Sequence, residues 1–185
     1  MTKKYPIIKS KYVETTFFLK DDEEKLYKSY IDEHRSNVAK FWNRLHPKCK
    51  GNFRFDDYYM HVIDGLIMHH DISKYTSEEF HGYRQYFYPR KGEQQDKYTF
   101  NMAWNFHQKA NMHHWEYWVI PNDAILPMPF TYIIEMLCDW GAMSIKFNNK
   151  ISDWYNENKE YMLLHEKTIK HIEKWMPLVD SCIID

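Results

Sequence analysis

Apolar residues recur at intervals of three and four along most of the chain, which is the spacing that one buried face of an α-helix requires. Glycine and proline are scarce, at 5 and 7 of 185 residues, so few positions interrupt this pattern. Pro129 is well placed at the first turn of the fifth predicted helix. We therefore expect an all-α fold, a compact bundle of about six helices. The predicted helices cover about residues 21–45, 55–70, 77–88, 98–115, 130–147 and 153–176.

Residues 1–20 differ from the rest, because they alternate only weakly between apolar and polar positions and include Pro6. We expect an extended N-terminal arm there. Residues 21–185 are expected to form one helical domain, since a chain of 185 residues is long enough for one substantial core but short for two.

Charge and cysteine content narrow the class of protein. The net charge is −1 and no basic stripe stands out, which argues against binding to a nucleic-acid duplex. Cys49, Cys138 and Cys182 lie far apart without metal-binding spacing, and their odd number favours a reducing, cytoplasmic setting. Neither a signal peptide nor an apolar run of membrane-spanning length is evident, so we expect no membrane partner.

The segment Met68–Lys74 (Met-His-His-Asp-Ile-Ser-Lys) carries the clearest chemical signal. The apolar face of the second predicted helix leads to His70 and, at its margin, to Asp71. Burying an imidazole beside an ionised carboxylate is costly unless a compensating group is present, and a metal ion compensates most strongly. The alternative is a capped helix end whose His and Asp face water, and the dipeptide alone favours that interpretation.

Two further polar residues occupy positions expected to be buried. His34 has apolar neighbours one turn away on each side of the first predicted helix, where a hydrogen-bonded core histidine is the common alternative to a ligand. Asp139 follows an inward face of the most apolar helix. A buried carboxylate is rarely left unpaired, and a salt bridge to a buried Arg or Lys is the alternative to metal or histidine contact.

The fourth predicted helix is rich in histidine. If it is continuous over 98–115, His107, Asn111 and His114 share one face and His113 points away. If it breaks near Asn111, His113 takes the place of His114. A histidine-rich surface helix explains the segment equally well.

The order of these residues resembles the HD-domain superfamily of metal-dependent phosphohydrolases, in particular a bacterial or phage branch of it. The resemblance covers about residues 26–144 and rests on Glu33–Val38, His70–Lys74 and Leu137–Trp140. It implies one or two divalent transition-metal ions, drawn from Mn, Fe, Co, Ni and Zn. The implied ligands are His34, His70, Asp71 and Asp139 for the first ion, and His107 with His114 or His113 for the second, bridged by Asp71.

The resemblance also implies a phosphomonoesterase or phosphodiesterase that acts on a nucleotide or a similar small phosphorylated metabolite. Asp71 and Lys74 would be catalytic, with Lys74 contacting the phosphate, and Arg84 would join them if its helix folds over the mouth of the site. Ordinary surface charge is the alternative for both cations. Two other functions use the same residues: a mixed-valent diiron oxygenase, and a catalytically inert ligand-binding protein. The sequence leaves a homo-oligomer open.

Overall fold

The computed structural model describes residues 21–49, 56–122 and 124–183, and the predicted arm over 1–20 lies outside them. The expectation of an all-α fold is confirmed. Within the described residues, the seven α-helices are α1 (Asp22–Cys49), α2 (Asp57–His69), α3 (Ser77–Phe87), α4 (Lys97–Ala110), α5 (Phe130–Phe147), α6 (Ile151–Asn158) and α7 (Glu166–Asp180). Three short 3₁₀ helices and one antiparallel strand pair connect them: η1 (Ile72–Tyr75), η2 (Trp115–Trp118), η3 (Lys159–Tyr161), β1 (Val119–Ile120) and β2 (Ala124–Ile125).

Three helix boundaries differ from those predicted. Helix α1 continues through Pro47 to Cys49, whose side chain is fully buried in the core. Helix α4 ends at Ala110, because Asn111 adopts an extended backbone conformation (φ −120°, ψ 106°). The last predicted helix is two helices, α6 and α7, and the side chain of His165 caps the second by accepting a hydrogen bond from the backbone N–H of Lys167.

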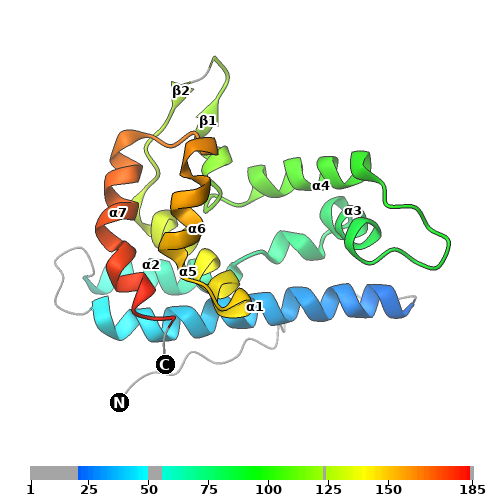
Figure 1. Cartoon of the computed structure of the whole chain (residues 1–185), viewed down its shortest axis with the longest axis horizontal. Coiled ribbons are helices and arrows are strands. Elements are labelled where there is room, and N and C mark those ends of the chain that lie inside the picture. The colour runs from blue at the N-terminus through cyan, green and yellow to red at the C-terminus, as the bar shows by residue number, and fades with distance from the viewer. Residues whose placement is uncertain (1–20, 50–55, 123, 184–185) are drawn as a thin grey trace.

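The helices form two groups along α1 (Figure 1). Helix α5 packs against α1, α2 and α7, and this group encloses the larger hydrophobic core. Helices α3 and α4 pack along each other over the N-terminal half of α1, around a smaller and mainly aromatic core. The first group is built on α5, the most apolar of the described helices, and the apolar periodicity of α5 is therefore evident in the sequence.

His34 lies on α1 at the change from one core to the other. Ile31, one turn before it, belongs to the smaller core, and Val38, one turn after it, belongs to the larger core. The side chain of His34 is only 8% exposed. The fold therefore places this imidazole where the two groups of helices meet.

Two glycines allow helices to approach closely. A Cβ atom at Gly141 of α5 would lie 2.4 Å from the ring of Phe41 of α1, and one at Gly82 of α3 would lie 2.7 Å from the carbonyl oxygen of Thr99 of α4. Any side chain at either position would push the paired helices apart. The spacing of α1 and α5, which carry His34 and Asp139, thus depends on Gly141.

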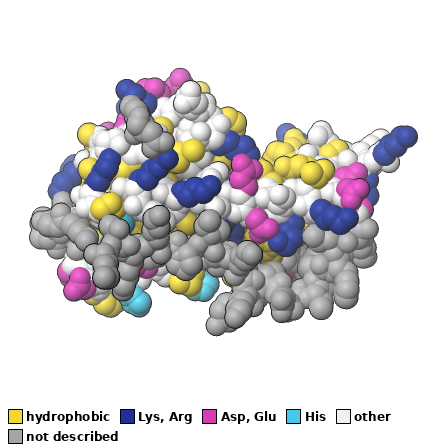
Figure 2. All heavy atoms as spheres, turned by 90° about the horizontal axis from the view of Figure 1, so that it is seen from below, with side chains coloured by type: hydrophobic (Ala, Val, Ile, Leu, Met, Phe, Trp, Pro, Cys, Tyr) yellow, Lys and Arg dark blue, Asp and Glu magenta, His cyan; other side chains and the backbone are white. Residues whose placement is uncertain are grey.

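No helix in the described part of the chain combines the length and the apolar character needed to cross a membrane. On the face seen in Figure 2, lysine and arginine side chains are interspersed with aspartate and glutamate. This mixed pattern agrees with the net charge of −1.

Candidate metal centre

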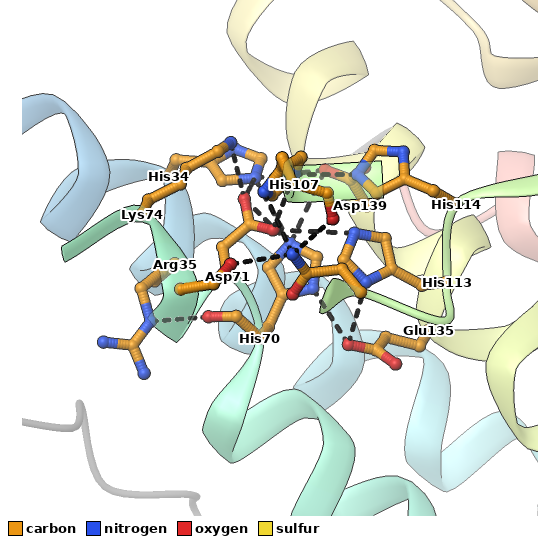
Figure 3. A network of polar contacts seen from close by, with 12 residues as sticks. His34, Arg35, His70, Asp71, Lys74, His107, His113, His114, Glu135 and Asp139 are labelled. Carbon is orange, nitrogen blue, oxygen red and sulfur yellow. Dashed lines mark hydrogen bonds and ion pairs between the residues drawn. The ribbon is translucent and has the colours of Figure 1, made fainter. Parts of the chain in front are cut away.

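The histidines and aspartates singled out from the sequence converge between the two groups of helices (Figure 3). They come from separate elements, so only the folded chain assembles them. Helix α1 contributes His34, the end of α2 leads into His70 and Asp71, α4 contributes His107, the turn after α4 contributes His113 and His114, and α5 contributes Asp139.

A sharp corner after α2 directs Asp71 into this cluster. Helix α2 ends at His69, and Asp71 adopts the left-handed conformation (φ 55°, ψ 21°), which Asp tolerates better than most residues. Arg35 of α1 holds the corner: its Nε donates to the carbonyl of His70 at 2.7 Å, and its Nη2 to that of Met68 at 2.9 Å. The guanidinium thereby satisfies carbonyls that the helix end leaves open.

Potential ligand atoms of His34, His70 and Asp71 form the first group, and Asp139 lies beside its two histidines. Nε2 of His34 lies 3.1 Å from Oδ1 of Asp139 and 3.4 Å from Oδ2 of Asp71. Nε2 of His70 lies 3.3 Å from Nε2 of His34, 3.6 Å from Oδ2 of Asp71 and 3.7 Å from Oδ1 of Asp139. Ligands about 2.1 Å from a tetrahedral ion are about 3.4 Å apart, so the separations among His34, His70 and Asp71 match the edges of a coordination shell.

The other oxygen of Asp71 faces a second group. Its Oδ1 lies 3.4 Å from Nε2 of His107 and 3.6 Å from Nε2 of His113. Nε2 of His114 lies 2.8 Å from Nε2 of His107. Asp71 therefore belongs to both groups, one oxygen to each, as a bridging carboxylate would.

Two buried glutamates that the sequence analysis missed hold these imidazoles. Oε1 of Glu135 lies 3.1 Å from Nδ1 of His70 and 3.3 Å from Nδ1 of His113. Oε2 of Glu79 lies 2.8 Å from Nδ1 of His107. A proton placed on Nδ1 by such a carboxylate leaves Nε2 with its lone pair directed into the cluster, which is the usual arrangement behind metal-ligating histidines.

The titratable groups perturb one another strongly. Burial alone would lower the pKa of His70, but the carboxylates of Asp71, Asp139 and Glu135 outweigh it and raise the pKa to about 10. Burial lowers the pKa of His107 to about 3, against the opposing effect of Asp71. The cluster thus contains one imidazole with a raised pKa, His70, and one with a lowered pKa, His107.

Two buried polar atoms of the cluster lack a hydrogen-bond partner among the described residues, which indicates whether a cation fits there. These atoms are Oδ1 of Asp71 and Nε2 of His113. Their separation of 3.6 Å is too long for a hydrogen bond between them. Buried polar atoms are seldom left unsatisfied, and a transition-metal ion between a carboxylate and imidazoles would satisfy both. The residues present therefore fit a metal ion.

The structure brings together all six residues proposed as ligands and adds His113. Because α4 ends at Ala110, the statement that His113 points away does not apply: its side chain is 2% exposed and faces Asp71. Both His113 and His114 belong to the second group of potential ligands. The backbone of the turn after Ala110, and not the spacing of a continuous helix, therefore determines where the side chains of His113 and His114 point.

The two proposed cations have different surroundings. Nζ of Lys74 lies 2.7 Å from Oδ2 of Asp71, beside the cluster. Arg84 is placed elsewhere, because its guanidinium forms an ion pair with Glu93 in the loop between α3 and α4. The idea that Arg84 folds over the mouth of the site is thus corrected, since the charge that it would offer a phosphate is already paired.

A surface cavity of about 450 Å³ reaches the cluster beside His113 and Glu135. Ser73 and Asn111 also line it, and the amide of Asn111 donates to Oγ of Ser73 at 2.7 Å. The remaining wall is largely apolar. This cavity gives solvent a route to the second group of ligands.

Comparison with known proteins gives a family without an assigned activity. Neither the curated proteins nor the solved structures contain a match to the chain. Residues 23–177, which include every residue of the cluster, match a family of unknown function, DUF5662. The cluster of histidines and aspartates lies within the matched region, and the chain therefore belongs to DUF5662.

Proposed function

We propose that this protein is a metal-dependent phosphohydrolase that acts on a nucleotide or a similar small phosphorylated metabolite. One observation carries the proposal. Asp71 is buried with imidazoles facing both of its oxygens, and the ammonium of Lys74 lies beside it. Imidazoles around a shared carboxylate suit a pair of metal ions, and an adjacent cation suits an anionic substrate. The order of the residues along the chain, which resembles the HD-domain superfamily, supports the same reaction.

The first ion would be held by four residues, and the second by Asp71 with the histidines of the other group. Bound divalent ions would polarise a phosphoryl group and lower the pKa of water to near neutrality. The first set is His34, His70 and Asp71, with Asp139 as the fourth residue beside the two histidines; the second is Asp71, His107, His113 and His114.

Lys74 would bind the phosphate. Its side chain is 15% exposed and lines a cavity next to the cluster, so the ammonium is accessible to a ligand there. Burial would lower the pKa of Lys74, but the carboxylate of Asp71 outweighs burial and raises it. The group therefore stays charged at neutral pH, as binding to a phosphate requires.

Glu79 and Glu135 would act as positioning residues. Each accepts a hydrogen bond at Nδ1 of a candidate ligand and so fixes the ring orientation and tautomer. Glu135 does this for two rings at once, His70 from the first group and His113 from the second. Movement of this one carboxylate would disturb both groups.

Metal analysis and a substrate panel test the proposal. The metal content of the purified protein is measured by mass spectrometry. Hydrolysis of nucleoside monophosphates and sugar phosphates is then followed by phosphate release, and hydrolysis of cyclic nucleotides by chromatography of the nucleoside monophosphate formed. We expect ester hydrolysis that requires a transition metal and falls at least a hundredfold in Asp71→Asn, whereas Asp153→Asn, at an exposed site on α6, should match the unaltered protein.

Two results would overturn this function. One is a fully metal-loaded protein that hydrolyses no ester in the panel. The other is a protein containing two irons that consumes dioxygen in the presence of a small alcohol or phosphonate, which would identify the diiron oxygenase instead. A protein that binds the panel compounds without turning them over would be a binding protein.

A further inference from the structure

A second cavity of about 410 Å³ lies on the Lys74 side of the cluster. Apart from Lys74, every residue that lines it is aromatic. Such a wall is unusual for a pocket that would receive only a phosphate, because phosphate is bound by cationic and hydrogen-bond-donating groups. The lining consists of Tyr27, Tyr30, Lys74, Tyr83, Phe87, Tyr88, Phe100 and Trp104.

The cavity adjoins the candidate ligands directly. The ring of Tyr30 lies 6.5 Å from that of His34 and nearly parallel to it, at 10°. Tyr83 meets His107 edge-on, with ring centroids 6.0 Å apart. Nζ of Lys74 lies 5.6 Å from the ring centroid of Tyr83. A phosphate at Lys74 would therefore place its organic substituent among these rings.

Two hydroxyl groups of the lining have no hydrogen-bond partner in the part of the chain that the structure describes. They belong to Tyr27 and Tyr83, which are 1% and 6% exposed. The hydroxyls are buried and do not open onto the cavity, so these two residues offer a ligand only their ring surfaces.

The spacing of these two tyrosines limits how a ring could bind. Their ring centroids are 6.2 Å apart at an interplanar angle of 10°, and a planar group between them would need about 7 Å. A ligand ring would therefore lie against the aromatic wall, not between this pair. Phe87, which is 55% exposed, offers a free face at the rim.

We propose that this aromatic cavity binds the planar heteroaromatic ring of the substrate against its aromatic wall, with the phosphate at Lys74. A nucleobase has the required flat shape and stacks on aromatic side chains. The identification of the ring as part of a hydrolysed substrate rests on the proposed function, but the recognition of the ring itself requires no metal and no reaction. The cavity would thus select aromatic phosphate esters over sugar phosphates.

The test compares ligands that differ only in the ring. Binding of AMP, GMP, CMP and UMP to the full-length protein is measured by calorimetry beside ribose 5-phosphate, which keeps the phosphate and the sugar. The four nucleosides, which lack the phosphate, are measured by ligand-observed NMR. We expect the best nucleotide to bind at least tenfold more tightly than ribose 5-phosphate, and its nucleoside to bind detectably to metal-free protein as well.

Matched variants assign the binding to the cavity. Phe87→Ala should weaken binding of the best nucleotide about tenfold, and Phe106→Ala, at a similarly exposed position on α4 (46%) outside the cavity, should not change it.

The outcomes separate this inference from the proposed function. If ribose 5-phosphate binds as tightly as every nucleotide, or if Phe87→Ala and Phe106→Ala bind alike, the aromatic cavity is not a ring-binding site, even if phosphate release is observed. If the nucleosides bind in a manner that depends on Phe87 while no ester is hydrolysed, the inference stands and the hydrolase proposal fails.

Discussion

Oε2 of Glu79 lies 2.8 Å from Nδ1 of His107, and each of these side chains is only 1% exposed. The two residues come from adjacent helices, α3 and α4, which pack closely because Gly82 has no side chain. Their contact fixes the imidazole so that Nε2 faces Asp71. A carboxylate behind a histidine in this way makes the histidine a better metal ligand.

Removing the charge of Glu79 should therefore weaken metal binding without removing a ligand. We expect Glu79→Gln to lower the affinity of the second metal position by about tenfold to a hundredfold. The affinity is measured by competition with a chromogenic chelator. Glu78→Gln, at the exposed neighbouring position, is the control and should leave the affinity unchanged. Equal affinities for the two variants would contradict a role for Glu79 in holding His107.

Metal stoichiometry tests the second group directly. His107→Ala should reduce the number of bound ions from about two to one and leave the fold intact, because the first group uses other residues. Mass spectrometry of the metal content and circular dichroism measure the two effects. His61→Ala, which replaces an exposed histidine on α2, should still bind both ions. Two ions in the His107 variant, or one in the unaltered protein, would rule out the second position and the diiron alternative with it.

Removal of the metal should also lower thermal stability. Without a cation, Asp71 and the imidazoles around it stay buried with incomplete compensation, and each such group costs roughly 1–3 kcal/mol. For a domain of this size we expect the melting temperature to fall by at least about 5 °C after chelation, and to recover when metal is added back. Asp71→Asn keeps a side chain that tolerates the left-handed conformation, and its melting temperature should no longer respond to chelation. An unchanged melting curve of the unaltered protein after verified metal removal would contradict this prediction.

Two glycine substitutions should have opposite effects, because Gly141 lies in the contact between α1 and α5 whereas Gly65 on α2 has open space around it. Gly141→Ala places a methyl group against the ring of Phe41 and should lower the free energy of unfolding by about 1–3 kcal/mol. Gly65→Ala on α2 meets no atom within 4 Å and should raise it by about 0.5–1 kcal/mol, because alanine loses less backbone entropy in a helix. Urea unfolding measures both. Destabilisation of equal size at the two sites would show that the close approach of α5 to Phe41 is not what matters.

The ion pair of Arg84 and Glu93 predicts a pH dependence. The hydrogen bond from Arg84 lowers the pKa of Glu93 from its usual 4.5 to about 2. The pair therefore stabilises the fold fully above pH 4.5, and this contribution declines as the pH falls towards 2, because the unfolded chain takes up the proton first. Glu93→Gln should cost about 1–3 kcal/mol at pH 7, and its difference from the unaltered protein should shrink between pH 4.5 and 2. Urea unfolding at several pH values measures this difference, and a constant difference would contradict the assignment.

The helical periodicity of the sequence predicted most of the fold. Helix α5 was predicted with the same bounds that the structure shows, Phe130–Phe147, because its apolar face is continuous and Pro129 precedes it. The inward positions of His34 and Asp139 followed from the same rule. The bundle was underestimated by one helix, since Leu164 and Thr168 continue the apparent period across the break between α6 and α7.

The turn after α4 and the role of Glu79 could not be predicted from the pattern, whereas the role of Glu135 could. His113 and His114 are compatible with a continuing helix, and only the backbone of Asn111 shows where the helix ends. Glu135 carried an unread signal, because it lies four residues before Asp139 and so on the same face of α5. Glu79 resembled an ordinary acidic residue of a helix N-terminus, and its burial depends on the packing of α3 against α4.

Two cavities that share no lining residue reach the same cluster, one at Lys74 and the other at His113 and Glu135. The cluster can therefore be approached from two sides, and a small molecule in one cavity does not block the other. A molecule occupying the aromatic side would leave the His113 side open to water, protons or a chelator. The order in which small species arrive and leave is consequently not dictated by a single entrance.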